Sequence, residues 1–122
     1  MQEVIKAILE KLQTVVPESY YISNDSPSVT YPYLVFRLDV ENDTWNSDGA
    51  YLDIDLYDDK GTNHEEIEKT VNDLKKSLEH YMVMLDACLL RVKFDGIGNT
   101  LPNSDSLQRR SMRFYLKIDW RN

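Results

Sequence analysis

The chain has 122 residues, of which 42% are hydrophobic and 29% are charged, and its formal net charge is −7. These values predict a single folded domain over residues 1–122 that buries a core without disulfide bonds. The acidic balance argues against a nucleic-acid-binding protein, whose affinity rests on clustered Lys and Arg side chains. No apolar run approaches the roughly 20 residues that cross a bilayer, and the N-terminus lacks a signal-peptide pattern. We therefore expect a protein made in a reducing cytoplasm, with no membrane partner.

The first third of the chain predicts a helix, a polar loop and a strand. Apolar residues recur at helical spacing from Gln2 to Val16, and Pro17 ends the pattern. The Ser-, Asn- and Pro-rich segment Glu18–Pro32 predicts a loop with a short extended piece at Tyr20–Ile22. The segment YLVFRLDVEN, Tyr33–Asn42, is rich in aromatic and β-branched residues and predicts a strand inside a sheet.

A β-hairpin is predicted next. Asn46–Gly49, with the sequence NSDG, has turn chemistry because Asp and Gly accept positive φ angles. Tyr51–Tyr57 predicts the returning strand, in which apolar and polar residues alternate. The alternation places three residues in the core: Leu52, Ile54 and Leu56. It also places Asp53 and Asp55 together on the opposite face.

A second helix is predicted after the hairpin. It begins with a capping-box pattern, formed either by Thr62 with Glu65 or by Asn63 with Glu66, and it runs to about Tyr81. The residues of its buried stripe recur at helical spacing: Ile67, Val71, Leu74 and Leu78.

Two further strands complete the predicted fold. They are Ala87–Phe94 and Leu107–Trp120, and the long polar segment Asp95–Ser106 joins them as a loop. The expected architecture is α+β, with two helices packed on one face of a four-stranded, mainly antiparallel sheet. The hairpin and the long loop are expected to project from it.

The stretch YLDIDLYDDKG places four aspartates in seven residues: Asp53, Asp55, Asp58 and Asp59. An EF-hand loop is excluded, because other residues occupy the positions of its turn glycine and bidentate glutamate. A magnesium site at Asp53 and Asp55 would need a third ligand and a phosphate-bearing substrate, and the alternative is a hydrated strand face. Motifs for acyl transfer, structural zinc and metalloproteolysis are missing, and we expect no cofactor.

Charge is distributed unevenly along the chain. Asp39–Asp73 has twelve acidic residues and two lysines, whereas Arg91–Asn122 has seven basic residues and three acidic ones. The acidic part of one molecule can meet the basic part of another, and the alternative is that both patches are simply solvated. Trp45, the large apolar residue of ENDTWNSDG, is either a contact anchor or a side chain that folds back onto its own sheet.

Several segments occur in an order that is shared with a known family. They are YPYLVF at Tyr31–Phe36, LDIDLYDDKG at Leu52–Gly61, EEIEKTVNDLKKSL at Glu65–Leu78 and RRSMRFYLKI at Arg109–Ile118. Over nearly the whole chain, their order and spacing resemble the tail terminator and tail completion proteins of long-tailed bacteriophages, including tail-to-head joining proteins. Where members of this family often have an aromatic-centred strand before the second helix, this chain has IDLY, ending at Tyr57.

The resemblance implies a small α+β virion structural protein without catalytic activity. Such a protein forms a homo-oligomeric ring, commonly a hexamer, at the head-proximal end of the tail of a phage or prophage particle. It stops growth of the tail tube and joins the head connector. The implied partners are other copies of the chain, a tail-tube protein and a head-connector protein, with DNA passing through the lumen without specific binding. The protein would be made in the cytoplasm of the bacterial host.

Two hypotheses assign residues to this ring. In the first, the subunit interface contains Trp45 and basic residues that face acidic residues of the next subunit: Arg91, Arg109, Arg110 and Arg113. In the second, an acidic lumen or interface repels the phosphates of DNA and is formed by Asp53, Asp55, Asp58 and Asp59.

Three alternatives to the tail terminator remain open. One is another neck or head-completion protein, since fold alone does not determine position in a virion. The second belongs to a different class and is a metal-dependent phosphoryl-transfer enzyme that uses Asp53 and Asp55. The third is a bacterial interaction module whose acidic face engages a basic partner.

Overall fold

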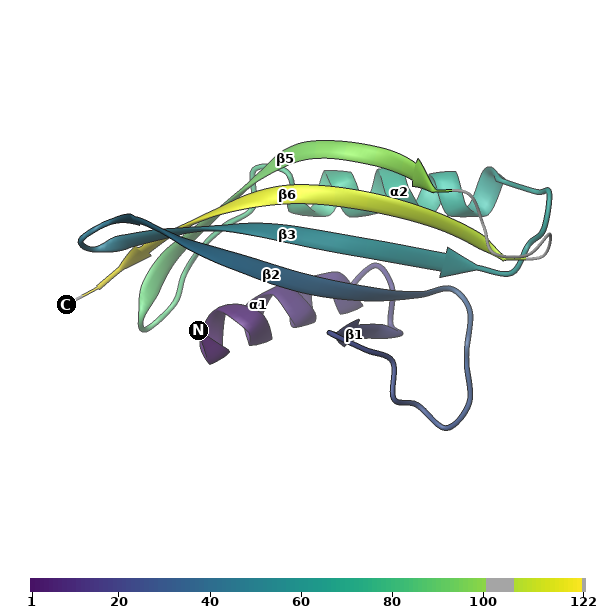
Figure 1. Ribbon diagram of the computed structural model, residues 1–122, viewed down its shortest axis with the longest axis horizontal. Helices are drawn as coiled ribbons and strands as arrows, with labels where there is room; N and C mark the ends of the chain where they lie inside the picture. Colours follow the sequence, from purple (N-terminus) through teal and green to yellow (C-terminus); the bar gives the residue numbers. More distant parts are fainter. Residues whose placement is uncertain (101–106, 122) are drawn as a thin grey trace.

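The computed structural model describes residues 1–100 and 107–121. Its elements follow one another in the order α1 (Gln2–Gln13), β1 (Ser19–Tyr21), β2 (Tyr33–Thr44), β3 (Ser47–Asp58), α2 (Glu65–Leu78), β4 (Met82–Met84), β5 (Cys88–Thr100) and β6 (Gln108–Trp120) (Figure 1).

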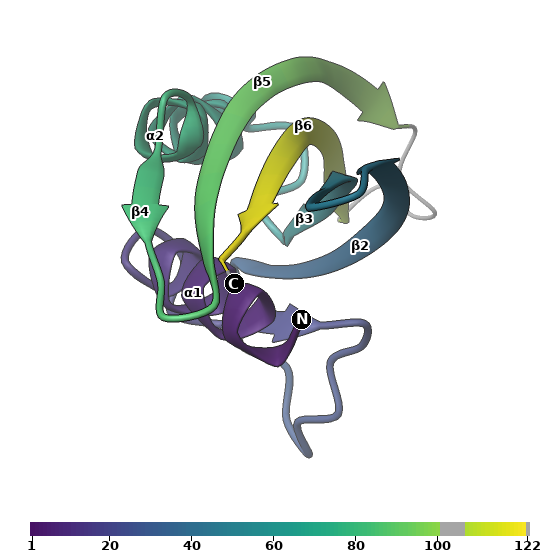
Figure 2. The same cartoon turned by 90° about the vertical axis from the view of Figure 1, so that its left-hand side faces the viewer.

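The strands form one mixed sheet in the order β1-β2-β3-β6-β5-β4. β1 runs parallel to β2, and the other neighbouring pairs are antiparallel. The expected four-stranded, mainly antiparallel sheet is therefore wrong, because the described residues form a mixed sheet of six strands. Of the two additional strands, β1 was predicted only as a short extended piece and β4 was not predicted. Each has three residues, which is too few for an alternating pattern to be recognised. Viewed along the strands, the sheet curls into a half-barrel (Figure 2).

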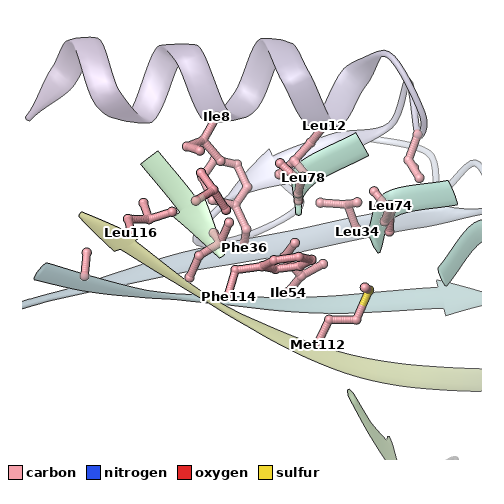
Figure 3. Packing of buried hydrophobic residues seen from close by; sticks show 14 of the residues in the cluster. Ile8, Leu12, Leu34, Phe36, Ile54, Leu74, Leu78, Met112, Phe114 and Leu116 are labelled. Atoms are coloured by element: carbon pink, nitrogen blue, oxygen red, sulfur yellow. The ribbon is translucent and has the colours of Figure 1, made fainter. Parts of the chain in front are cut away.

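Both helices lie on the same side of the curled sheet and share one core with it (Figure 2). The apolar stripes predicted for the helices are buried there. Full burial of one such side chain contributes about 1.5–3 kcal/mol, so this core is the main force that holds the helices to the sheet. Its residues that Figure 3 labels, each at most 2% exposed, are Ile8, Leu12, Leu34, Phe36, Ile54, Leu74, Leu78, Met112, Phe114 and Leu116.

The hairpin turn lies earlier than predicted. β2 ends at Thr44 and β3 begins at Ser47, so Trp45 and Asn46 form the turn. Gly49 lies inside β3, where its missing side chain makes room for Tyr115 of β6. A Cβ atom on Gly49 would lie 1.8 Å from the hydroxyl oxygen of Tyr115 and 2.7 Å from the ring carbon that carries it. The glycine is thus needed for packing, not for the turn.

The ends of two other elements also differ from the prediction. α2 starts without a capping box: the side chain of Asn63 accepts a hydrogen bond from the backbone N–H of Glu65 at 3.1 Å. β5 continues to Thr100 and takes up the first part of the predicted loop. The rest of that loop, residues 101–106, lies outside the described residues.

The outer edge of β2 is only partly covered. β1 pairs with Leu34–Phe36. Among the described residues, no strand pairs with the outer edge of β2 from Arg37 to Thr44. The side chains of this open part are mostly polar or charged, including Asp39 and Glu41.

Replacing Gly49 by Ala tests the contact with Tyr115. We expect Gly49→Ala to destabilise the protein by about 1–3 kcal/mol, because the tyrosine ring must move out of its place against β3. The free energy of unfolding is measured by urea denaturation followed by circular dichroism.

Gly98→Ala is the matched control for this variant. A Cβ atom on Gly98 meets no other atom within 4 Å, so this change should leave the free energy of unfolding nearly unchanged. An equal loss of stability in both variants would mean that the cost belongs to strand glycines in general and not to the Tyr115 contact.

Candidate interaction surface

The sheet face opposite the helices carries charged and aromatic side chains from β3 and β6. The register sets Asp53 opposite Arg113 and Asp55 opposite Ser111. Arg113 Nε donates a hydrogen bond to Asp53 Oδ1 at 2.8 Å, and Ser111 Oγ donates one to Asp55 Oδ1 at 2.7 Å. Arg109 adds an ion pair with Asp55 at 3.3 Å. Both carboxylates therefore have partners within their own chain.

Tyrosine rings flank these ion pairs. The guanidinium of Arg113 lies 4.7 Å from the ring centre of Tyr51, and that of Arg109 lies 5.7 Å from the ring centre of Tyr57. Each exposed ion pair contributes at most about 1 kcal/mol, and each exposed cation–π contact about 0.5–1 kcal/mol. Together they hold the guanidinium groups against the sheet, so a neighbouring molecule meets paired charges.

A second polar cluster is buried under the start of α2. Arg110, 8% exposed, donates from Nε to Glu68 Oε1 at 2.7 Å, and its Nη2 lies 3.0 Å from His64 Nδ1. Gln108, 2% exposed, donates from Nε2 to two backbone carbonyls of the loop 61–63 at 2.7 and 2.8 Å. These bonds fasten the loop before α2 to the beginning of β6.

Asp58 lies on the core side of β3 and is 1% exposed. Its Oδ1 accepts a hydrogen bond from the backbone N–H of Asp59 at 2.8 Å. Burial raises the pKa of the Asp58 carboxyl above its ordinary value. Asp59 itself is exposed. The four aspartates of the stretch are thus placed differently: Asp53 and Asp55 are ion-paired, Asp58 is buried and Asp59 is exposed.

Trp45 stands at the tip of the β2–β3 hairpin, which projects at one end of the sheet (Figure 1). Its side chain is fully exposed, so it does not fold back onto its own sheet. The hairpin below it is fastened to β6. Asp43 forms an ion pair with Lys117, and this hydrogen bond lowers the pKa of the Asp43 carboxyl. Asp48 accepts a hydrogen bond from the indole N–H of Trp120 at 2.8 Å.

A hollow of about 340 Å³ lies over β5 and β6 beside this hairpin. Arg91, at its rim, pairs with Asp119 at 2.8 Å. Lys93 has no ion pair with any described residue. The residues that line the hollow are Arg91, Val92, Lys93, Tyr115 and Lys117.

Only Arg91 in this hollow was a predicted interface residue. Lys93, Tyr115 and Lys117 share its sheet face, because Arg91 is opposite Lys117 and Lys93 is opposite Tyr115. The sequence shows that these side chains alternate with apolar residues along each strand. It does not show that they lie together, because that depends on the register of β5 on β6.

The structure adds no support for a metal site. Within residues 1–100 and 107–121, no three His, Cys, Asp or Glu side chains are grouped so that they could hold a metal ion. Asp53 and Asp55, the pair considered for magnesium, already accept hydrogen bonds from Arg113 and Ser111. Over the same described part of the chain, no helix is long and apolar enough to span a membrane.

Two solved structures have a similar fold. A chain of the virion of a native gene transfer agent particle matches with a TM-score of 0.71 and 14% sequence identity, over 88% of this chain and 84% of that chain. A second solved chain, for which no function is stated, matches with a TM-score of 0.64 and 12% identity, over 100% of this chain and 96% of that chain. No protein-family model matches the sequence, and no curated protein does. At these identities the likeness shows a shared fold.

Replacing Asp58 by Asn tests the buried carboxyl. Since burial raises its pKa in the folded state, Asp58 contributes most to stability below its unfolded pKa, and this contribution is lost as the pH rises through the folded pKa. The free energy of unfolding of Asp58→Asn minus that of the wild type should therefore be larger at about pH 7 than at about pH 3. The lower pH lies below the ordinary pKa of Asp. Urea denaturation at the two pH values measures the difference.

Asp59→Asn is the matched control, because it makes the same change one residue later on an exposed side chain. Its stability relative to wild type should depend less on pH. If both variants respond to pH alike, the burial of Asp58 is not the cause.

Proposed function

We propose that the protein is a structural component of a phage or phage-like virion and, within it, a tail terminator or tail completion protein. The observation that carries the first part is the fold shared with a chain of the gene transfer agent virion, over 88% of this chain. The second part is supported by the order of segments from YPYLVF to RRSMRFYLKI, which resembles the tail terminator family.

In this role, copies of the chain form a ring, a hexamer in our proposal, at the head-proximal end of the tail. The ring ends growth of the tail tube and presents a surface to the head connector. DNA passes through its lumen. The net charge of −7 is consistent with a wall that does not hold DNA, since affinity for DNA requires that its phosphates be neutralised.

The contacts within the chain refine which predicted interface residues suit a contact between subunits. Arg110 is buried against Glu68, and Arg109 and Arg113 are paired with aspartates of β3. Arg91 is half exposed and is also paired, with Asp119, so its contacts do not set it apart from Arg113. Trp45 is fully exposed. We therefore keep Trp45 as the leading interface residue.

The proposed acidic wall is refined in the same way. Asp59 is exposed, whereas Asp53 and Asp55 present carboxylates that are partly neutralised by arginines. Asp58 is buried. A wall built from this stretch would therefore owe its charge mainly to Asp59.

Deleting the gene from the genome that carries it tests the proposal. Without a terminator the tail tube has no stop, so electron micrographs of the particles should show tails of irregular length and heads without tails. The gene supplied on a plasmid should restore joined particles with tails of uniform length. An unrelated virion gene deleted in the same way provides the comparison.

The location of the protein separates the two parts of the proposal. Antibody labelling should mark the junction of head and tail in purified particles. A label on the capsid or at the far end of the tail would contradict the terminator role and leave the virion role standing. Normal particles after deletion, together with absence of the protein from purified particles by mass spectrometry, would contradict both.

A further inference from the structure

We propose that Trp45 of one copy inserts into the hollow over β5 and β6 of the next copy, which gives a head-to-tail contact between identical chains. The inference rests on the proposed function in that a ring requires copies to associate. It goes further by naming the two surfaces that meet.

The projecting side is a fully exposed indole on a braced hairpin. Thr44 Oγ1 and Ser47 Oγ, on either side of the turn, are hydrogen-bonded at 2.6 Å. The side-chain amide of Asn42 donates to the backbone carbonyl of Thr44 at 3.2 Å. A braced tip loses little conformational freedom when it binds, and tryptophan is among the residues that most often dominate the energy of an interface.

The receiving side has the chemistry that an indole prefers. The ring of Tyr115 and the aliphatic parts of Arg91, Lys93 and Lys117 supply apolar surface. The charged ends of Arg91 and Lys117 are paired with Asp119 and Asp43. A cation near the face of an indole is attracted by the negative potential of the ring. Gly49 helps to form the hollow, since any side chain there would displace Tyr115.

Charge favours the same pairing. The hairpin around Trp45 carries three acidic residues, Glu41, Asp43 and Asp48, and the sequence has no Lys or Arg between Arg37 and Lys60. Of the three basic residues of the hollow, Arg91 and Lys117 are already paired within the chain, with Asp119 and Asp43. Among the described residues, Lys93 in the hollow and Glu41 on the hairpin form no ion pair, so these two charges can attract each other between copies. Opposite charges on two surfaces speed their encounter and orient it.

The two surfaces are separate, although they are neighbours on one molecule. Asp43 reaches Lys117 at the rim of the hollow, yet Trp45 remains fully exposed and leaves the hollow of its own chain open. Each copy can therefore offer its tryptophan to one neighbour and its hollow to another. Such a contact between unlike surfaces generates a ring when the rotation between copies closes.

Two single variants test the contact, one on each side. Trp45→Ala removes the indole, and Lys93→Glu places a negative charge where the acidic hairpin would bind. The wild-type protein should self-associate as its concentration rises, followed by light scattering and sedimentation velocity. Each variant should weaken the association at least about 30-fold, the factor that corresponds to the loss of one dominant interface residue.

The matched controls change similar side chains elsewhere on the surface. Met84→Ala truncates an apolar side chain of β4 that is 59% exposed, and Lys69→Glu reverses an exposed charge on α2. Both should associate as the wild type does. Circular dichroism confirms that all four variants are folded before their association is compared.

Mixing the two defective variants gives the sharpest test. The Trp45→Ala chain retains its hollow and the Lys93→Glu chain retains its tryptophan, so one sound contact can form between them. The mixture should give heterodimers that do not grow further, whereas each variant alone stays monomeric. Self-association of Trp45→Ala equal to that of the wild type, or a mixture without heterodimers, would overturn the proposal.

The remaining results separate this inference from the proposed function. A wild-type chain that stays monomeric up to about 1 mM would overturn the contact between copies. The contact would also be overturned if the variants associate normally but fail to enter particles, because the hairpin would then bind a different virion protein. In either case the deletion and labelling experiments still decide whether the protein terminates tails.

Discussion

The pairing of β3 with β6 is the constraint on which the rest of the structure depends. It joins twelve residue pairs, from Ser47 opposite Asp119 to Asp58 opposite Gln108, at the centre of the sheet. Because side chains alternate along a strand, this register sends the apolar residues of both strands to the helices, and it sends the ion pairs of Asp53 and Asp55 to the other face. A shift by one residue would exchange the two faces, so the core and the charged surface are fixed together.

Long repeating patterns were what the sequence revealed most reliably. The buried stripes of both helices and the alternation in β3 each extend over several repeats, and all were correctly placed. Elements of three residues, such as β1 and β4, offer no repeat and depend on pairing with a neighbour for their existence. The NSDG segment was misread as a turn because local preference for positive φ yielded to the packing of Gly49 against Tyr115.

The candidate surface was less predictable because it joins distant parts of the chain. Asp53 and Arg113 are 60 residues apart, and only the register of two strands shows that they neutralise one another. The position of Arg110 under α2 likewise depends on how the helix lies across the sheet. Trp45 is the opposite case. Its place in the polar stretch ENDTWNSDG left two interpretations, and the full exposure of its side chain excludes the one in which it folds back onto its own sheet.

The open edge of β2 has a consequence for the life of the free protein. An unpaired strand edge is a template on which other chains can add strands and grow into fibrils. Here Arg37, Asp39 and Glu41 place a charge at every second position of that edge, and charged side chains on an edge strand disfavour the addition of further strands. The charges therefore guard the open edge next to the turn that presents one large apolar side chain, Trp45, to a neighbouring molecule.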